Sequence, residues 1–249
     1  MNHEAFQFQK RSFRGKHRVQ EVLTCLKLSG NNPKSGLLLD LGCGWGHLNR
    51  LFLEKGIETV GVEIVKKRIQ NSKKISPKGN YILADGCKLP FKKRCFDTII
   101  SNDVLEHVPY DLANPMFEEA NRTLKTNGVV YISVANRYQI QEPHTFVPFL
   151  TWFPRPFWNT VHKLVKNRPM EWVVYPYTTR RLKNLCKETK FHYENFMWIY
   201  ALYKVSKMDY IGNRTLRKIV KTIKKLGFTR QAQIIAERFS VIIFVCRKY

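Results

Sequence analysis

A glycine-rich turn and the acidic residue that follows it carry the clearest chemistry in this sequence. The segment reads Asp40-Leu41-Gly42-Cys43-Gly44-Trp45-Gly46, and its glycines come directly after an apolar run at 37–41. Glycines at such a point permit a tight turn and let a ligand lie against bare backbone. Glu63 ends the next apolar segment, where a carboxylate can accept hydrogen bonds from two ribose hydroxyls. The spacing fits neither the dinucleotide fingerprint nor the phosphate loop, so the two features together predict a nucleoside-binding site.

Alternating strand and helix patterns predict the scaffold that positions these residues. The expected strands are 37–41, 59–63, 81–84, 96–101, 129–134 and 191–200, with a last one at 239–246 that joins as an antiparallel member, and the expected helices are 17–28, 46–55, 65–72, 115–125, 157–165 and 179–188. Short buried-type strands separated by helices are typical of parallel sheets covered on both faces. We therefore predict an α/β fold with a doubly wound, mostly parallel seven-stranded sheet.

Composition divides the chain into four segments. Residues 1–36 are expected to form an N-terminal helical segment, and 37–136 the ligand-binding core. Residues 137–177 are rich in proline and aromatic side chains, which predicts an irregular cap insertion. Residues 178–249 are expected to complete the sheet, interrupted by a basic helical insertion at about 201–238.

Six ordered motifs in the core are shared with a known family. They are Leu39-Asp40-Leu41-Gly42-Cys43-Gly44-Trp45-Gly46, Val62-Glu63, Ala84-Asp85-Gly86, Leu89-Pro90-Phe91, Phe96-Asp97 and Leu105-Glu106-His107-Val108. In this order they resemble the motifs of class I S-adenosylmethionine-dependent methyltransferases, and most resemble the small-molecule branch typified by the quinone-biosynthesis enzymes. The resemblance covers about residues 35–136 and implies a Rossmann-like methyltransferase fold.

The resemblance also implies S-adenosyl-L-methionine as cofactor, S-adenosyl-L-homocysteine as product, and a set of cofactor contacts. These are Gly42, Gly44 and Gly46 beneath the methionine and ribose with Cys43 among them, Asp40 on the methionyl amino group, Glu63 on the ribose diol, Ile64 against the adenine, Asp85 on the adenine amino group with the Gly86 and Cys87 backbone nearby, and Asn102 at the methionyl end. From the residues alone, simpler roles stay open. Asp40 can cap the following helix, Asp85 can be an ordinary turn residue, and Cys43 and Cys87 can be small packing residues.

The chemistry expected of such a site needs neither a metal ion nor a covalent nucleophile. The sulfonium carries its own activated methyl group, so the protein's main task is alignment of the acceptor, which can contribute about 7–11 kcal/mol. A hydroxyl acceptor would also need a general base, and the candidates for this catalytic role are His107 and His144. His144 begins the aromatic segment and is the one expected to contact the acceptor. Each histidine can equally be structural, His107 as a packing residue and His144 as a loop anchor.

The net charge of +24 is concentrated near the C-terminus, where residues 137–249 hold 22 basic and 6 acidic side chains. Residues 214–228 place apolar and basic side chains on opposite faces of an expected helix, and aromatic residues gather at 152–158. Such features suit an anionic membrane surface and an amphipathic acceptor. They predict a lipid-linked acceptor with an anionic head and a peripheral membrane position, although a solvated helix and an ordinary cap core would leave the same pattern.

The six cysteines are scattered, with no C-x-x-C pair and no histidine at ligand spacing. This pattern is typical of reduced thiols in the cytoplasm, and it predicts neither a disulfide framework nor a metal site. Residues 1–20 contain no apolar run, so no signal peptide is expected. The longest apolar stretch, 241–246, is far too short for a membrane span.

Two other functions compete with methylation of a small molecule. The first is an RNA or DNA methyltransferase, because a basic chain suits a phosphate backbone. The segment Ser101-Asn102-Asp103-Val104 differs, however, from the Pro-Pro-aromatic motif of enzymes that grip a flipped base. The second is a non-catalytic scaffold that has kept the fold, which the complete set of cofactor motifs disfavours.

Overall fold

One sheet of seven strands organises the part of the chain that this computed structural model describes, residues 3–171, 173–197 and 241–248. The strands are β1 (Leu38–Leu41), β2 (Thr59–Glu63), β3 (Asn80–Leu83), β4 (Phe96–Asn102), β5 (Leu124–Val134), β6 (Phe191–Asn195) and β7 (Ile242–Lys248). Their order is β3-β2-β1-β4-β5-β7-β6. The first five strands pair in parallel, and β7 runs antiparallel to both β5 and β6. The predicted doubly wound, mostly parallel sheet is confirmed, and it is open at both edges.

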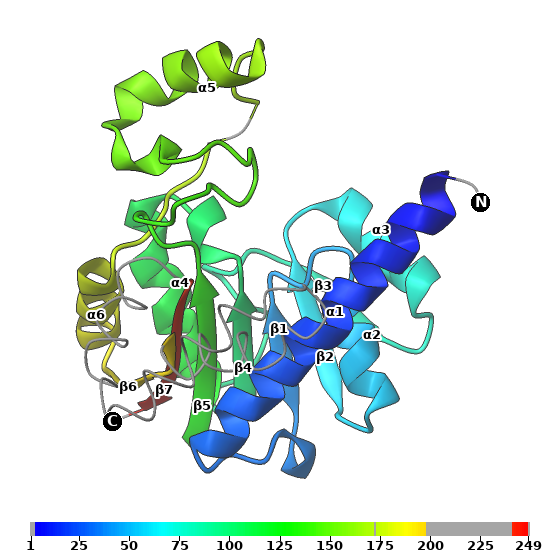
Figure 1. The fold of residues 1–249 in the computed structure, drawn as a ribbon. Helices are drawn as coiled ribbons and strands as arrows, with labels where there is room; N and C mark the ends of the chain where they lie inside the picture. Colours follow the sequence, from blue (N-terminus) through cyan, green and yellow to red (C-terminus); the bar gives the residue numbers. More distant parts are fainter. Residues whose placement is uncertain (1–2, 172, 198–240, 249) are drawn as a thin grey trace, which may run out of the picture.

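Helices cover both faces of this sheet (Figure 1). They are α1 (His3–Leu28), α2 (His47–Glu54), α3 (Lys66–Ile75), α4 (Tyr110–Thr123), α5 (Trp158–Lys166) and α6 (Thr179–Glu188), with short 3-10 turns η1 (Pro33–Ser35), η2 (Leu105–His107), η3 (Leu150–Trp152) and η4 (Arg155–Phe157). Alternate strand residues point to opposite faces. Leu39 therefore joins a core with α4 and α6, whereas Leu38 joins a second core with α1 and α2.

The observed start differs most from the expected one at α1, and by five residues at both α4 and β5. The helix expected from 17 begins at His3, and the helix expected at 115–125 is α4, Tyr110–Thr123, with Pro115 inside it. The apolar face of α4 begins upstream of the proline because Ala113 is buried against the sheet with Met116 and Phe117. Burial of this face therefore overrides the usual preference of proline for the first helical turn. β6 ends at Asn195 and β7 begins at Ile242, whereas residues 198–200 and 239–240 of the two expected strands lie outside the described residues. The remaining elements shift at their ends by a few residues.

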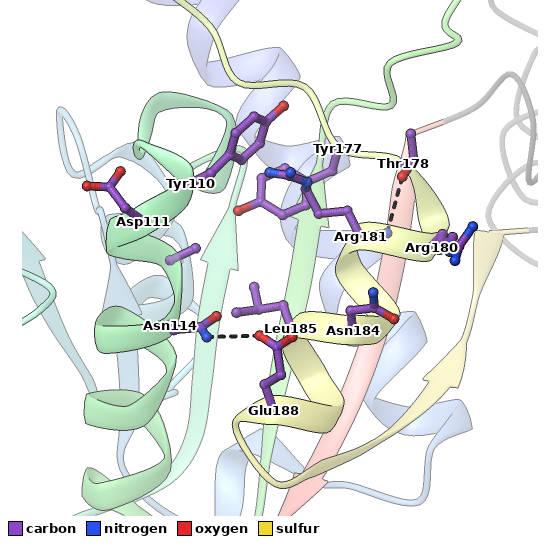
Figure 2. Close-up of a pocket in the computed structure, with 11 residues that line it drawn as sticks. Tyr110, Asp111, Asn114, Tyr177, Thr178, Arg180, Arg181, Asn184, Leu185 and Glu188 are labelled. Carbon is purple, nitrogen blue, oxygen red and sulfur yellow. Dashed lines mark hydrogen bonds between the residues drawn. The ribbon is translucent and has the colours of Figure 1, made fainter.

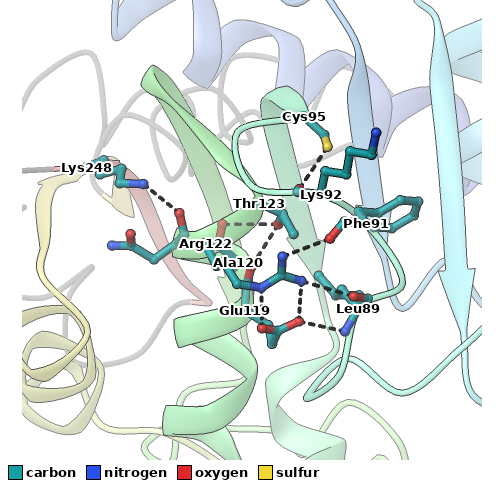
Figure 3. Close-up of polar contacts among 10 residues, drawn as sticks. Leu89, Phe91, Lys92, Cys95, Glu119, Ala120, Arg122, Thr123 and Lys248 are labelled. Atoms are coloured by element: carbon teal, nitrogen blue, oxygen red, sulfur yellow. Dashed lines mark hydrogen bonds and ion pairs between the residues drawn. The ribbon is translucent and has the colours of Figure 1, made fainter.

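Arg122 near the end of α4 fixes the loop that leads from β3 to β4 (Figure 3). Its guanidinium donates to the carbonyl oxygens of Leu89 at 3.0 Å and Phe91 at 2.8 Å, and it pairs with Glu119 at 2.6 Å. Glu119 in turn accepts a hydrogen bond from the Leu89 amide. The Leu-Pro-Phe motif is thus held against α4, which fixes the path of the chain after the cavity residues at 84–87.

Residues 137–177 leave the sheet after β5 and form a lobe of their own. The lobe stands beyond the end of β5 in Figure 1 and carries α5. Its small core contains Val147, Leu150 and Trp158, and an isolated bridge between Asn136 and Tyr177 joins it to the sheet region. The predicted basic insertion at about 201–238 lies outside the described residues, so the four-segment division stays a prediction. Within the described ranges, no helix combines the length and apolarity that a bilayer crossing requires.

Candidate active site

The carboxyl ends of β1, β2 and β4 surround a cavity of about 250 Å³. Parallel strands bring the residues that follow them to one edge of the sheet, where ligands of open α/β folds bind. Among the residues predicted to contact a cofactor, those that line the cavity are Gly42, Glu63, Ile64, Asp85, Gly86 and Cys87. His107 also lines it. The fold therefore gathers at one place residues from four separate motifs.

A larger cavity of about 540 Å³ lies elsewhere, between α4 and α6 (Figure 2). The Arg181 guanidinium lies over the Tyr110 ring there, 3.6 Å from its centroid, and Asn114 donates to Glu188. None of the predicted site residues lines this cavity. We therefore place the candidate active site at the smaller cavity, where the polar groups converge.

The glycine turn needs its glycines for two different reasons. Gly42 has a φ of +80°, and a Cβ there would lie 2.6 Å from a methyl carbon of Val104. Gly44 has a φ of +56°, yet a Cβ there would meet no described atom within 4 Å. Gly42 is therefore required by close packing, whereas Gly44 leaves open space beside Glu63. Gly46 caps α2 and packs against Ser72 and Tyr81, outside the cavity lining.

Glu63 is tied directly to this turn. Its Oε2 accepts a hydrogen bond of 3.0 Å from the Gly44 amide, and its Oε1 accepts one of 3.0 Å from the Val65 amide. Arg68 adds an ion pair at 3.4 Å. The carboxylate is only 4% exposed but lines the cavity. Each of its oxygens has more than one lone pair, so the oriented group keeps acceptor capacity for a ligand.

Asp40 and Asn102 lie near the carboxyl ends of β1 and β4 but are not among the residues that line the cavity. Asp40 is 2% exposed, and its Oδ2 has no hydrogen-bond partner among the described residues. The Oδ1 of Asn102 is likewise buried and unpartnered in the described structure. Burial, followed by the negative charge of Glu63, raises the pKa of Asp40 to about 7. A buried polar atom without a hydrogen-bond partner lowers the stability of a protein. Within the described ranges, each of these two oxygens therefore lacks a donor that it could accept from.

The two cysteines of the predicted set lie in different surroundings. Cys87 lines the cavity, and its amide donates to Asp85 Oδ1 at 2.9 Å. Asp85 therefore makes the ordinary turn contact and still lines the cavity. Cys43 packs with Ile69 and Tyr81 away from the cavity, where burial raises the pKa of its thiol. Its side chain is a packing residue, which leaves only its backbone for the predicted cofactor contact.

The two histidines meet although 36 residues separate them in the sequence. The ring of His107, on η2, lies edge-to-face with that of His144, with centroids 4.9 Å apart. Burial, His144 and Arg68 lower the pKa of His107. The hydrogen bond from His144 Nδ1 to Glu142, at 2.7 Å, raises the pKa of His144. The pair therefore consists of one histidine biased to the neutral form and one biased to the charged form.

Sequence reasoning missed four charged residues of this region: Arg68, Asp103, Glu106 and Glu142. Asp103 has a φ of +55° and pairs with Arg18 at 2.5 Å; its place after Asn102, at a strand end, was a usable signal. Glu106 precedes His107 in the sequence, but its burial is a tertiary property. Potential ligand atoms of Glu106, His107 and His144 all lie within 4.8 Å of one another, a grouping that the sequence spacing did not predict.

Comparisons with known proteins identify similar domains and folds. Residues 39–132 match the sequence profile of a family described as methyltransferase domain. A ubiquinone biosynthesis O-methyltransferase from Pelagibacter ubique is 34% identical over 114 residues, which cover 44% of this chain and 46% of that protein. An uncharacterized methyltransferase from Mycobacterium leprae is 33% identical over 112 residues, covering 43% and 40%. The chain spans about half the length of the curated relatives it matches.

Solved structures share the fold. A SAM-dependent methyltransferase from Archaeoglobus fulgidus superposes with a TM-score of 0.52 at 19% identity, covering 95% of this chain and 98% of that one. Phosphoethanolamine N-methyltransferase 2 from Haemonchus contortus, in complex with S-adenosyl-L-methionine, gives a TM-score of 0.54 at 17% identity, covering 92% and 52%. At these identities the likeness concerns the fold alone. The matched domain and its ordered motifs nevertheless confirm the resemblance predicted from the sequence: residues 39–132 form a methyltransferase domain similar to those of class I S-adenosylmethionine-dependent methyltransferases.

Proposed function

We propose that this protein transfers the methyl group of S-adenosylmethionine to a small-molecule or lipid-linked acceptor by in-line displacement. The observation that carries the proposal is the joint position of Glu63 and the glycine turn. The Gly44 amide donates a hydrogen bond to the Glu63 carboxylate, and Glu63 lines the cavity together with Gly42 of the same turn, so a nucleoside held by Glu63 is also placed against the turn.

The residues present fit this cofactor. The unpartnered Asp40 Oδ2 and Asn102 Oδ1 are acceptors for the donors of a methionyl ammonium group. The open space beside Gly44 leaves room for a bound ligand. The Glu63 carboxylate retains hydrogen-bond acceptor capacity for the ribose diol. Ile64 is 63% exposed beside the cavity, an apolar surface suited to one face of the adenine. Asp85 would accept from the adenine amino group.

When bound, the cofactor supplies an activated methyl group on its sulfonium. The chain's own residues then orient the acceptor and hold its proton. His107 lines the cavity, and its lowered pKa keeps the ring neutral near pH 7, so it can accept a proton from an acceptor hydroxyl. His144, whose ring is held by Glu142, contacts His107 and orients it. A positioned general base of this kind contributes about 10²–10⁴-fold to the rate.

The lobe at 137–177 supports an amphipathic acceptor. It exposes a set of aromatic side chains, which are Phe146, Phe149, Trp152, Phe153 and Phe157. Basic residues accompany them, including Arg155, whose guanidinium lies 4.5 Å from the Tyr175 ring centroid. Aromatic rings next to cationic groups suit a greasy chain with an anionic head and the interface of an anionic membrane. We therefore extend the proposal to a peripheral membrane position.

Calorimetry with S-adenosylhomocysteine tests the cofactor half of this proposal. We expect one binding event per chain and a thermal stabilisation that grows with ligand concentration. If neither heat nor a thermal shift is observed, the chain is a non-catalytic member of the family and the proposal fails.

Transfer of a labelled methyl group tests the acceptor half. The protein is incubated with labelled S-adenosylmethionine and with separate lipid, quinone, glycan and RNA extracts. We expect label in the lipid or quinone fraction, and a His144→Ala variant should bind S-adenosylhomocysteine normally but transfer label more slowly. Label confined to the RNA fraction would overturn the acceptor class, and full activity of the variant would remove His144 from the site.

A further inference from the structure

Glu106, His107 and His144 form a group that is here called the EHH cluster. All three side chains can act as metal ligands, a capacity that methyl transfer does not require. One ligand atom from each residue lies within 4.8 Å of the other two. Two imidazoles and one carboxylate are a common ligand set for first-row transition metals, as in catalytic zinc sites and in iron sites with open positions. Ligands at 2.0–2.2 Å from a tetrahedral ion lie about 3.3–3.6 Å apart, so the ligand atoms of the cluster would have to approach one another by at most about 1.2–1.5 Å to reach this geometry.

Glu106 provides an independent reason to expect a cation here. The residue is 2% exposed, and its Oε2 has no hydrogen-bond partner in the described structure. Leaving a buried carboxylate oxygen without a partner costs free energy. Oε2 of Glu106 is therefore an acceptor that a bound cation would satisfy.

Glu142 supplies the supporting contact that metal-binding histidines usually have. It is 2% exposed and accepts hydrogen bonds from the backbone amides of His144 and Thr145. Its Oε1 lies 2.7 Å from His144 Nδ1. This contact directs the Nδ1 proton toward the carboxylate and leaves Nε2 as the nitrogen with a free lone pair. Carboxylate–histidine–metal arrangements of this kind orient the ring and raise its basicity.

We propose that the EHH cluster binds a divalent first-row transition ion of the Zn²⁺ type, with Glu106, His107 and His144 as protein ligands and Glu142 supporting His144. Asp103 and Glu142 add negative charge around the cluster, whereas Arg68, whose charge also acts on His107, opposes it. Three protein ligands leave at least one coordination position for an exchangeable oxygen.

The open position gives the ion a role beside the cavity that His107 lines. An acceptor oxygen bound there would be polarised and its pKa lowered. Since coordination occupies the imidazole lone pairs, the two rings would then act as metal ligands and no longer as a general base. This role rests on the proposed methyl transfer, whereas the metal site itself does not.

The test uses the full chain, stripped of metal with a chelator and titrated with Co²⁺ and, separately, with Zn²⁺. We expect one tight ion per chain and Co²⁺ d–d absorption without the intense charge-transfer band of thiolate ligands. Glu106→Gln keeps the shape of the side chain but removes its charge, and it should weaken Co²⁺ binding at least 100-fold, as should His144→Ala. Glu142→Gln should weaken it about 10–100-fold. The matched control is His192→Ala, because His192 is an exposed histidine on β6, and its loss should leave the affinity unchanged.

Three results would overturn the proposal: no stoichiometric binding, equal affinity in Glu106→Gln and the unmodified protein, or a thiolate band that assigns the ion to cysteine. If His144→Ala does not fold, as judged by circular dichroism, the two glutamine variants decide. S-adenosylhomocysteine calorimetry on the same preparations separates the two proposals. Metal binding without nucleoside binding removes the proposed function and leaves the site, whereas nucleoside binding without metal binding does the reverse.

Discussion

The Asp40 carboxyl makes cofactor affinity depend on pH in a defined direction. Burial and the charge of Glu63 raise its pKa from 3.8 to about 7 in the ligand-free protein. An ammonium group binds the ionised carboxylate, so binding at low pH must release the proton that Asp40 carries. A group with a pKa of about 7 is about one-tenth ionised at pH 6 and about nine-tenths ionised at pH 8. Affinity for S-adenosylhomocysteine should therefore rise about tenfold between these values, which corresponds to ~1.4 kcal/mol.

The same pKa fixes the sign of a stability measurement on the ligand-free protein. Between about pH 4 and pH 7 the folded state keeps a proton on Asp40 that the unfolded state has released. The contribution of this group to the free energy of unfolding is therefore fully present below pH 4. It falls as the pH rises toward 7, by at most ~1.4 kcal/mol per pH unit, and levels off above 7. Asp40→Asn is neutral at every pH and should lack this slope.

Calorimetric titrations at pH 6, 7 and 8, in two buffers of different ionisation enthalpy, measure both affinity and proton release. We expect release of nearly one proton at pH 6 and almost none at pH 8. Asp40→Asn should bind more weakly at pH 8 and show neither effect, whereas Asp111→Asn, a control on the exposed side of α4, should behave like the unmodified protein. A pH-independent affinity in the unmodified protein, or the same slope in Asp40→Asn, would refute the reasoning.

Three further predictions concern the turn and its supports. Glu63→Ala should weaken S-adenosylhomocysteine binding by about 1–3 kcal/mol through loss of charged hydrogen bonds, and calorimetry showing unchanged affinity would contradict the assignment. Gly44→Val should lower the free energy of unfolding by about 1–2 kcal/mol because of its left-handed backbone and should abolish binding. Gly56→Val, at a φ of +72° with equally open space, should cost similar stability and still bind. Arg122→Ala should lower the free energy of unfolding, measured by denaturant, by about 1–3 kcal/mol because the carbonyl of Leu89 loses its donor. The affinity for S-adenosylhomocysteine should stay unchanged, because Arg122 does not line the cavity.

Local patterns predicted much of the fold. The expected strand at 59–63 and the expected helix at 179–188 have the observed boundaries of β2 and α6, because apolar periodicity and capping act within a few residues. Pro115 misled the prediction for α4 because proline is most common at the first helical position, whereas here the helix start is set by burial of Ala113 against the sheet.

The sequence by itself predicted the glycine turn, the place of Glu63 at a strand end and the resemblance to methyltransferases, since each depends on neighbouring residues or on motifs in a fixed order. Only the tertiary structure decided which side chains meet. Asp40 is buried, and the Cys43 side chain packs against Ile69 and Tyr81. The ring of His144 lies against that of His107 and close to Glu106. The physical reason is that burial and long-range contact depend on how separate strands and the 137–177 lobe pack together, and no local spacing contains that information.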